Sequence, residues 1–284
     1  MQKYEKRGYL EDDYKMFYLK DCAKKEYPEH YHEFDKILLF LKGNVRYTIE
    51  GKTYDLMPND IVLVKRGDIH KVEIDGKEEY ERMVIYISPQ YLTRFSKEGT
   101  PGLNACFDKT KENNSNVVRT AKMTQTSVYK TMMQLKRSFE EECADELEPL
   151  YRETLFLQFM IQLNRAIQKE DNLYADTDHC NPKIVKILRY INAHLTEELS
   201  INHIAETFYL SRYHMMRQFK QETGYTIGTY ISQKRLLYAR ELLREGASVT
   251  KACYESGFKE HSTFTRAYKQ LFGVTPAKSR EENG

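Results

Sequence analysis

Two stretches of the chain repeat one pattern and decide the fold of its C-terminal part: "IAETFYLSRYHMMRQFKQETGYT" at 204–226 and "ACYESGFKEHSTFTRAYKQLFGVTPAKSR" at 252–280. In the first stretch, Ile204 and Ala205 mark a short amphipathic helix, and Ser211 is a favourable N-cap for a second helix. Two short helices joined by a tight turn form a helix-turn-helix unit, whose second helix can enter the major groove of DNA. The repeated pattern therefore predicts two such units in one chain.

The two copies align at fixed offsets. Arg217 matches Arg266 at an offset of 49 residues, whereas the preceding helix aligns at 48, with Ala205 opposite Cys253. The second turn is therefore expected to be one residue longer than the first. Between the copies, residues 227–245 have the pattern of a long helix. A rigid helix here would hold the two recognition helices about 34 Å apart, which matches successive major grooves on one face of DNA.

Charge is distributed unevenly between the two parts of the chain. The formal net charge is +2, but residues 181–284 hold 16 Lys and Arg against 10 Asp and Glu. The remainder holds 28 basic and 32 acidic residues. A basic C-terminal part joined to a mildly acidic N-terminal part favours a nucleic-acid partner for the basic part.

Length and composition limit the class of protein. With 284 residues, of which 40% are hydrophobic, the chain is long enough for two folded domains. It contains no apolar run long enough to span a membrane, and its N-terminus lacks the apolar core of a secretory signal. The five cysteines are scattered singly, which is not the spacing of a disulfide framework or a zinc knuckle. We therefore expect a cytoplasmic protein with no membrane partner.

The N-terminal part is expected to be built from strands. Residues 15–90 contain short β-rich runs separated by turn residues, and in one run Val45, Tyr47 and Ile49 alternate with polar neighbours. Many short strands at regular spacing predict a sandwich or a barrel. The polar, turn-prone run at 109–116 predicts a mobile loop.

Helical patterns follow the predicted strands. A helix at about 146–169 carries apolar residues on more than one stripe, so we expect it to pack against two partners, one of them a second subunit. The alternative is a well-covered core helix. From Lys183 onward the pattern is one of short helices. We therefore divide the chain into a barrel at 1–110, a helical dimerisation or connector region at 111–170, a linker at 171–182 and a DNA-binding domain at 183–284.

Many fixed spacings over about a hundred residues carry a family resemblance. They include Ile204-Ala205, Leu210-Ser211, Phe219-Lys220, Gly224, Arg235-Leu236, Gly257-Phe258, Phe264, Arg266, Tyr268-Lys269, Gly273 and Thr275-Pro276. In this pattern residues 183–284 resemble the DNA-binding domain of AraC/XylS-type transcription regulators. Two positions depart from it, since Cys253 stands where alanine is usual and Tyr268 where phenylalanine is usual. Both side chains can still fill apolar positions.

The resemblance implies sequence-specific binding to double-stranded DNA. Arg217 and Arg266 are expected to reach base edges, where arginine can make a bidentate contact with guanine. A phosphate contact is the alternative for both. RNA polymerase is a candidate protein partner. By position in the family pattern, the expected DNA-contacting residues are Tyr213, Met216, Arg217, Lys220, His261, Ser262, Arg266 and Lys269.

Two motifs in the N-terminal part, "HYHEFDKILLFLKG" at 30–43 and "MPNDIVLVKRGDIH" at 57–70, resemble the cupin-like effector domain found in many such regulators. His30, His32 and His70 match three metal-ligand positions of cupin enzymes, but Lys36 and Ile37 occupy the place of the usual fourth ligand, a glutamate. The resemblance implies an effector site without metal. The expected effector-binding residues are His30, His32, His70, Arg46 and Tyr47, with Tyr54 and Lys65 as further candidates.

Two other interpretations of the histidines stay open at this point: a site for Fe, Mn, Ni or Zn, and histidines with a purely structural role. Together the patterns predict an α+β protein with an N-terminal cupin-like β-barrel, trailing helices and a C-terminal all-α domain of two helix-turn-helix units. We expect no cofactor and no enzymatic activity, but a DNA-binding regulator controlled by a small-molecule effector, which the family resemblance suggests is a carbohydrate. The rival hypotheses are a cupin-type metal-dependent enzyme with a helical appendage and an architectural DNA-binding protein without an effector.

Overall fold

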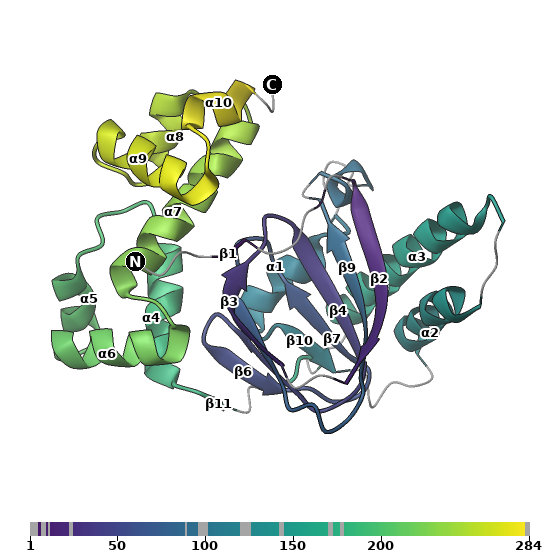
Figure 1. Ribbon diagram of the computed structural model, residues 1–284. Coiled ribbons are helices and arrows are strands. Elements are labelled where there is room, and N and C mark those ends of the chain that lie inside the picture. The colour runs from purple at the N-terminus through teal and green to yellow at the C-terminus, as the bar shows by residue number, and fades with distance from the viewer. Residues whose placement is uncertain are drawn as a thin grey trace. The chain divides into compact units, whose positions relative to one another are not determined.

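The computed structural model of the protein shows two compact units, one from Lys6 to His179 and the other from Cys180 onward (Figure 1). Each unit is described by itself below. The residues that the structure describes are 5–6, 10, 12–22, 25–88, 90–95, 102–119, 126–141, 145–169, 173–176 and 179–281. In this part of the chain no helix is long and apolar enough to cross a membrane.

The N-terminal unit is a sandwich of two antiparallel sheets. The first has the order β10-β7-β4-β9-β2, formed by β10 (Val117–Arg119), β7 (Asp60–Val64), β4 (Asp35–Lys42), β9 (Tyr80–Ile87) and β2 (Tyr14–Asp21). The second contains β3 (Lys25–Tyr31), β8 (His70–Ile74), β5 (Val45–Ile49) and β6 (Lys52–Asp55) in that order, with the two-residue strands β1 (Glu5–Lys6) and β11 (His179–Cys180) at its ends. The mixed α+β class predicted from the sequence is confirmed.

Strand β4 is buried on both faces, which explains its uninterrupted apolar run. Ile37 and Leu39 pack in a core cluster together with residues of the N-terminal helices. Leu38 and Phe40 lie in a second cluster between the two sheets. Because side chains alternate along a strand, the even-numbered residues of β4 point into the interior of the sandwich. Lys36 has the same parity and is only 7% exposed.

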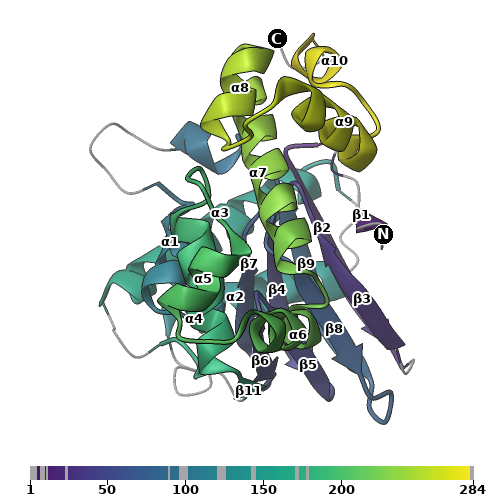
Figure 2. The same ribbon diagram turned by 90° about the vertical axis from the view of Figure 1, so that its left-hand side faces the viewer.

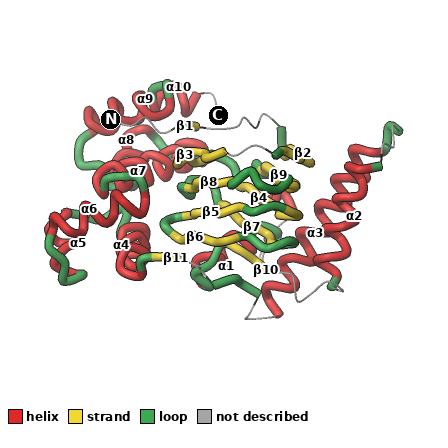
Figure 3. The backbone as a smooth tube through the Cα atoms, turned by 60° about the horizontal axis from the view of Figure 1, so that its bottom comes forward, coloured by secondary structure: helices red, strands yellow, loops and turns green. Residues whose placement is uncertain are grey.

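Helices cover the outer face of the five-stranded sheet (Figure 1, Figure 3). They are α1 (Ala105–Glu112), α2 (Ser127–Glu140) and α3 (Glu148–Lys169), and the short 3-10 helix η1 (Leu92–Phe95) precedes them. Helix α3 buries Phe156, Phe159 and Met160 in this core. Leu150, Tyr151 and Ile161 on the same helix are 61%, 51% and 39% exposed. Helix α3 thus carries apolar side chains that its own unit leaves exposed.

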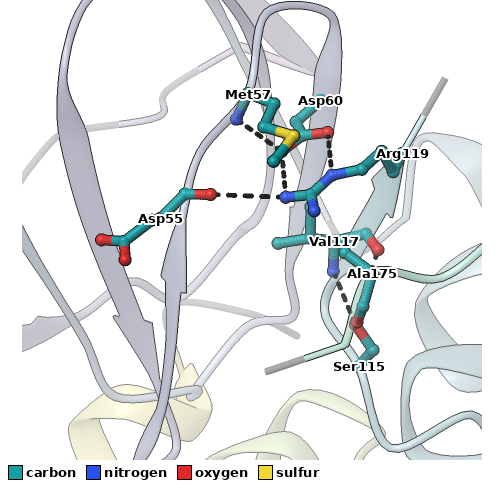
Figure 4. Close-up of polar contacts among 7 residues, drawn as sticks. All are labelled: Asp55, Met57, Asp60, Ser115, Val117, Arg119 and Ala175. Carbon is teal, nitrogen blue, oxygen red and sulfur yellow. Dashed lines mark hydrogen bonds and ion pairs between the residues drawn. The ribbon is translucent and has the colours of Figure 1, made fainter. Parts of the chain in front are cut away.

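The expectation of a mobile loop at 109–116 is wrong. Helix α1 continues to Glu112, and the two residues before β10, Ser115 and Asn116, are buried. Ser115 Oγ donates a hydrogen bond to the Ala175 carbonyl (2.7 Å), and Asn116 Nδ2 donates one to the Leu63 carbonyl (2.9 Å). Figure 4 shows the Ser115 side chain in this position, between Val117 and Ala175. Polar residues are buried here because partners distant in sequence satisfy them, which composition does not show.

Part of the expected linker is held against strand β10. The Ala175 N–H donates to the Val117 carbonyl (2.8 Å), and the Arg119 N–H donates to the Leu173 carbonyl (2.8 Å). The Arg119 side chain pairs with the buried carboxylate of Asp60 at 2.9 Å (Figure 4). Residues 173–176 are thus paired with the sheet, while positions 171, 172, 177 and 178 of the expected linker lie outside the described residues.

The C-terminal unit consists of helices. They are α4 (Pro182–Ala193), α5 (Ile201–Thr207), α6 (Arg212–Thr223), α7 (Ile227–Arg244), α8 (Val249–Glu255), α9 (His261–Phe272) and α10 (Pro276–Glu281). Helix α9 begins and ends 49 residues after α6, whereas α8 begins and ends 48 residues after α5. The predicted repeat and its longer second turn are therefore confirmed. Helix α7 joins the two helix-turn-helix units along its length (Figure 2).

Candidate DNA-reading helices and ligand cavity

The second helix of each repeat begins and ends as its sequence predicts. The Ser211 side chain accepts a hydrogen bond from the His214 N–H (3.3 Å), which caps α6 at its N-terminus. Helices α6 and α9 both end at a glycine, Gly224 with a φ of 77° and Gly273 with a φ of 80°. This left-handed conformation strains other residues, so the glycines at matching places in the repeat stop both helices cleanly.

Helix α6 has one buried face and one exposed face. Met215 and Phe219 are fully buried and fix the helix to its unit. The predicted DNA-contacting residues recur at three- and four-residue spacing, which places them together on the other side. Tyr213 is 78% exposed, Arg217 and Lys220 are exposed, and Met216 is half-buried. The structure therefore gathers Tyr213, Met216, Arg217 and Lys220 on one accessible face.

Helix α9 repeats this arrangement. Phe264 and Tyr268 are fully buried, and the Tyr268 hydroxyl donates to Ser279 Oγ (2.8 Å), which ties α9 to α10. The four predicted residues on the other side are all exposed: His261, Ser262, Arg266 and Lys269. Both recognition helices thus offer cationic and hydrogen-bonding groups to solvent from a fixed scaffold. Cys253 departs from the alanine that is usual in the family pattern, but its side chain is fully buried in the core of the second repeat. It therefore fills the apolar position as expected.

The turn of the second repeat packs against a side chain from α7. Arg235 donates from Nε to the Leu195 carbonyl (2.8 Å) and from Nη2 to the Glu197 carbonyl (2.6 Å). Gly257 lies in the turn with a φ of 90°, and a Cβ atom there would come within 2.9 Å of Arg235 Nε. Glycine at this position is therefore required both by the backbone conformation and by the close approach of Arg235.

The three predicted histidines of the N-terminal unit lie together and are buried. Their ligand nitrogens all fall within 4.8 Å of one another. His30 and His70 are opposite each other in the β3–β8 pair, with ring centroids 4.3 Å apart, and His32 follows directly after β3. The structure thus brings the three predicted histidines together.

The protonation of His70 follows from its contacts. His70 Nδ1 lies 3.0 Å from the Asp68 carbonyl, which can only accept, so Nδ1 carries the proton and Nε2 is left as an acceptor. In the described structure this buried Nε2 has no hydrogen-bond partner. Burial, and then the positive charge of Lys36, hold the pKa of His70 well below its usual range. His70 is therefore a neutral imidazole.

A cavity of about 200 Å³ opens beside these histidines within the sandwich. Two histidines and several tyrosines contribute to its wall. Strands β4 and β9 contribute residues of one parity, because in each strand the other parity faces the helices. The lining comprises Leu19, Tyr27, His30, His32, Lys36, Leu38, Val72, Tyr80, Arg82, Val84 and Tyr86.

Five of the seven candidate effector residues do not line this cavity: His70, Arg46, Tyr47, Tyr54 and Lys65. Arg46 has the opposite parity to Tyr47 on β5, and it pairs on the surface with Asp55 (3.1 Å) and Glu73 (3.8 Å). Lys65 pairs with Asp108 (2.6 Å), also outside the cavity. Their charges are already compensated by carboxylates, so the assignment of Arg46 and Lys65 to the effector site is wrong.

The two tyrosine candidates are buried behind or beside the site. The Tyr54 hydroxyl accepts a hydrogen bond from the Asn116 N–H (3.0 Å) in the core, away from the lining. The Tyr47 ring stacks almost parallel to His70, with centroids 5.8 Å apart. Tyr47 therefore supports His70 from behind and does not itself form the cavity wall.

Sequence reasoning missed the cations of the cavity. Lys36 Nζ lies 5.7 Å from the centroid of the Tyr47 ring, and burial, followed by the charge of Arg82, lowers the pKa of Lys36 to about 7. Arg82 and Tyr86 on β9 also line the cavity. Parity along β4 could have found Lys36, since it shares the inward face with Leu38 and Phe40.

The donor set fits a metal ion only in part. Three neutral imidazoles could hold one, but the place of the usual glutamate ligand has an ammonium group. The positive charge of Lys36 contributes to the lowered pKa of His70. The same charge would repel a metal cation held by the histidines. A complete cupin metal centre is therefore not formed by these residues.

Comparison with known proteins agrees with both halves of this description. Residues 15–160 match the family model of an AraC-like ligand binding domain, and residues 204–282 match that of a helix-turn-helix domain. The chain is 26% identical over 257 residues to the HTH-type transcriptional activator RhaS of Enterobacter sp. (strain 638), with 90% of this chain and 88% of the relative covered. It is 27% identical over 262 residues, with the same coverage, to RhaS of Escherichia coli O139:H28 (strain E24377A / ETEC).

Solved structures also resemble the chain. ToxT from Vibrio cholerae matches with a TM-score of 0.37 and 14% identity, over 95% of this chain and 98% of that one. A transcriptional regulator with an AraC-type DNA-binding domain from Chromobacterium violaceum matches with a TM-score of 0.34 and 30% identity, over 36% of this chain and 93% of that one.

Proposed function

Because this chain belongs to the AraC family of transcription regulators, with a ligand-binding domain ahead of its DNA-binding domain, we propose that a small molecule bound beside His30, His32 and His70 sets its affinity for DNA. The observation that carries this proposal is the cavity beside the histidine cluster. His30 and His32 line it, and an imidazole can both donate and accept hydrogen bonds. A hydroxyl-bearing ligand would match such groups, which supports a carbohydrate or a related molecule as the effector.

The DNA contacts are proposed from the exposed faces of the two recognition helices. Arg217 and Arg266 occupy equivalent places in α6 and α9, and both are exposed. We assign them to base edges, and we assign Lys220 and Lys269 to phosphates. Since the relatives are named transcriptional activators, RNA polymerase is the proposed protein partner of the DNA-bound form.

A second copy of the chain is the proposed partner of helix α3. Leu150, Tyr151 and Ile161 lie on an exposed stripe that also carries Thr154 and Gln158, separate from the face that packs in the core. Large apolar groups that are exposed beside polar ones mark an interaction surface. A homodimer would bring four recognition helices to DNA and raise the effective concentration of the second pair.

Selection of bound duplexes from a random DNA library, with the full-length chain as bait, tests the proposed function. We expect enriched sequences with two conserved blocks centred about one helical turn apart, roughly 10.5 base pairs. Unbiased recovery of all sequences would contradict sequence-specific regulation.

A metal-dependent enzyme is the second candidate, and the three-histidine cluster is the observation that favours it. Metal analysis of the purified protein separates the two functions. One bound Fe, Mn, Ni or Zn per chain would support the enzyme, and protein that binds DNA with no bound metal would support the regulator.

A further inference from the structure

Lys36 places an ammonium group inside the ligand-binding unit. It is buried on the inward face of β4, and it lines the cavity beside His30 and His32. In the described structure no carboxylate lies within ion-pairing distance of Nζ, and its one recorded partner is the ring of Tyr47. A buried charge is unfavourable unless an opposite charge or hydrogen bonds compensate it. The site therefore contains a cation whose counter-charge the protein does not supply.

Arg82 adds a second cation to the same wall. Its Nη1 lies 2.5 Å from Asp21 Oδ2 and donates to the Tyr80 carbonyl (3.0 Å), and its guanidinium lies over the Tyr80 ring at 4.1 Å from the centroid. These contacts hold the group in place through one nitrogen. A guanidinium has five N–H donors in a planar fork, and no contact of Nε or Nη2 is recorded among the described residues. Arg82 is thus positioned and has donors left for a ligand.

The lining described for the cavity includes these two cations and no aspartate or glutamate. Asp21, the carboxylate that Arg82 contacts, is already paired with it. Tyr27, Tyr80 and Tyr86 supply polar hydroxyls and ring surface around the cations. Such a lining is complementary to an anion and repels a metal cation.

We infer that the cavity binds a small carboxylate, whose charged group accepts hydrogen bonds from Lys36 Nζ and the Arg82 guanidinium. Hydroxyl groups on the same ligand would reach His30 and His32, the two histidines that line the cavity. The cavity volume of about 200 Å³ is below the roughly 300–1,000 Å³ of pockets for drug-sized ligands, so the part of the ligand that it encloses is of monosaccharide size or smaller. This inference rests on the proposed function and narrows its effector from a neutral carbohydrate to a sugar acid or hydroxy acid.

Thermal unfolding of the full-length chain with matched pairs of ligands tests the inference. The pairs are D-glucuronate and D-glucose, D-galacturonate and D-galactose, and D-gluconate and D-sorbitol, with ionic strength equalised by sodium chloride. Three proteins are compared: wild type, Lys36→Met and Lys42→Met. Lys42 is the control because it lies on the same strand but is exposed. We expect at least one acid to raise the Tm of wild type by about 2 °C more than its neutral counterpart does. The increase should persist in Lys42→Met and vanish in Lys36→Met.

Other outcomes separate this inference from the proposed function. Equal or larger shifts with the neutral sugars would overturn the carboxylate site and leave an effector-controlled regulator standing. No shift with any acid, or a shift that survives in Lys36→Met, would overturn it as well. A Lys36-dependent shift that leaves DNA affinity unchanged would keep the carboxylate site and remove the proposed control of DNA binding. A cooperative thermal transition of Lys36→Met without ligand shows that the variant is folded.

Discussion

Lys36 is expected to make the protein less stable at neutral and acidic pH than an uncharged residue would. Its pKa is lowered from 10.5 to about 7, mainly by burial and further by Arg82. Because the folded-state pKa lies below the unfolded value, the penalty is complete below pH 7 and is relieved as pH rises from 7 to 10.5. Lys36→Met should therefore raise the free energy of unfolding at pH 6 by a few kcal/mol, at about 1.4 kcal/mol for each pKa unit.

Urea unfolding of wild type and Lys36→Met at pH 6 and pH 10 measures this effect. The gain should be much smaller at pH 10, where the lysine is neutral in the folded protein. The difference between the two proteins is the relevant quantity, since all other titratable groups are common to both. Lys42→Met should show little change at either pH. A Lys36→Met protein that is destabilised at pH 6 would show that the charge is compensated in the apo protein.

Gly257 is the residue of the second turn most sensitive to substitution. Gly257 and Gly246 share a φ of 90°, but only at Gly257 would a Cβ atom meet Arg235, whereas nothing lies within 4 Å at Gly246. Both alanine variants should lose roughly 1–2 kcal/mol to the left-handed conformation. Gly257→Ala should lose at least about 1 kcal/mol more, because Arg235 must give up its contacts with the 195–197 carbonyls. Equal Tm values for the two variants would show that Arg235 moves aside without cost.

Single residues were predictable from the sequence where a pattern fixed the face they occupy. The His-x-His pair and His70 converge because β3 and β8 are neighbouring strands. Arg46 was misassigned, although alternation with Tyr47 already placed it on the opposite face of β5. From the sequence, Lys36 only marked the place where the usual glutamate ligand is absent. That its ammonium group is buried in the interior follows only once β4 is known to be buried on both faces.

At the scale of elements, helix α6 should read bases through Arg217. Arg217→Ala should weaken binding to the selected duplex and relax the preference at one base pair, with a loss of discrimination of roughly 1–3 kcal/mol. Lys220→Ala, on the same exposed face, should weaken all sequences alike and lower the salt dependence. Competition binding with single-base variants of the duplex measures both. If Arg217→Ala also weakens every sequence equally, Arg217 contacts a phosphate.

Helix α3 should hold the dimer through its exposed stripe. Tyr151→Glu and Ile161→Glu place a charge on that stripe and should yield monomers, whereas Gln134→Glu, at an exposed polar position of α2, should not. Leu157 is a poorer probe, because it is partly buried against the core of its own unit. Size-exclusion chromatography with light scattering gives the masses. A wild-type chain that is monomeric at micromolar concentration would remove the proposed interface.

The helices of the C-terminal unit could be predicted from the sequence because each is defined locally, by caps, glycines and apolar spacing. The repeat also allowed each helix of one copy to be checked against its equivalent in the other. The structure of residues 109–119 could not be predicted in this way. The burial of this stretch depends on Asp60, Leu63 and Ala175, all more than 50 residues away in the chain. Local polarity there predicts a loop, whereas the long-range hydrogen bonds make it part of the sandwich.

At the scale of the whole molecule, the account requires the ligand to bind one arrangement of the two units more tightly than another. Length and charge predicted the two parts and a nucleic-acid partner for the basic part. The cavity was not predictable as such, because it is formed where strands β3, β4, β8 and β9 contribute side chains from distant segments. Residues 173–176, paired with β10, lie between the two domain-model matches.

The most direct test of the central claim is the dissociation constant for a selected duplex, measured by fluorescence anisotropy with and without the ligand that gives the largest thermal shift. For wild type we expect saturating ligand to change Kd by at least about fivefold. His32→Ala should bind DNA without ligand as wild type does and show no change with ligand, because an imidazole that lines the cavity is lost. A wild-type Kd that stays constant at saturating ligand, or a full response in His32→Ala, would contradict control of DNA binding from this cavity.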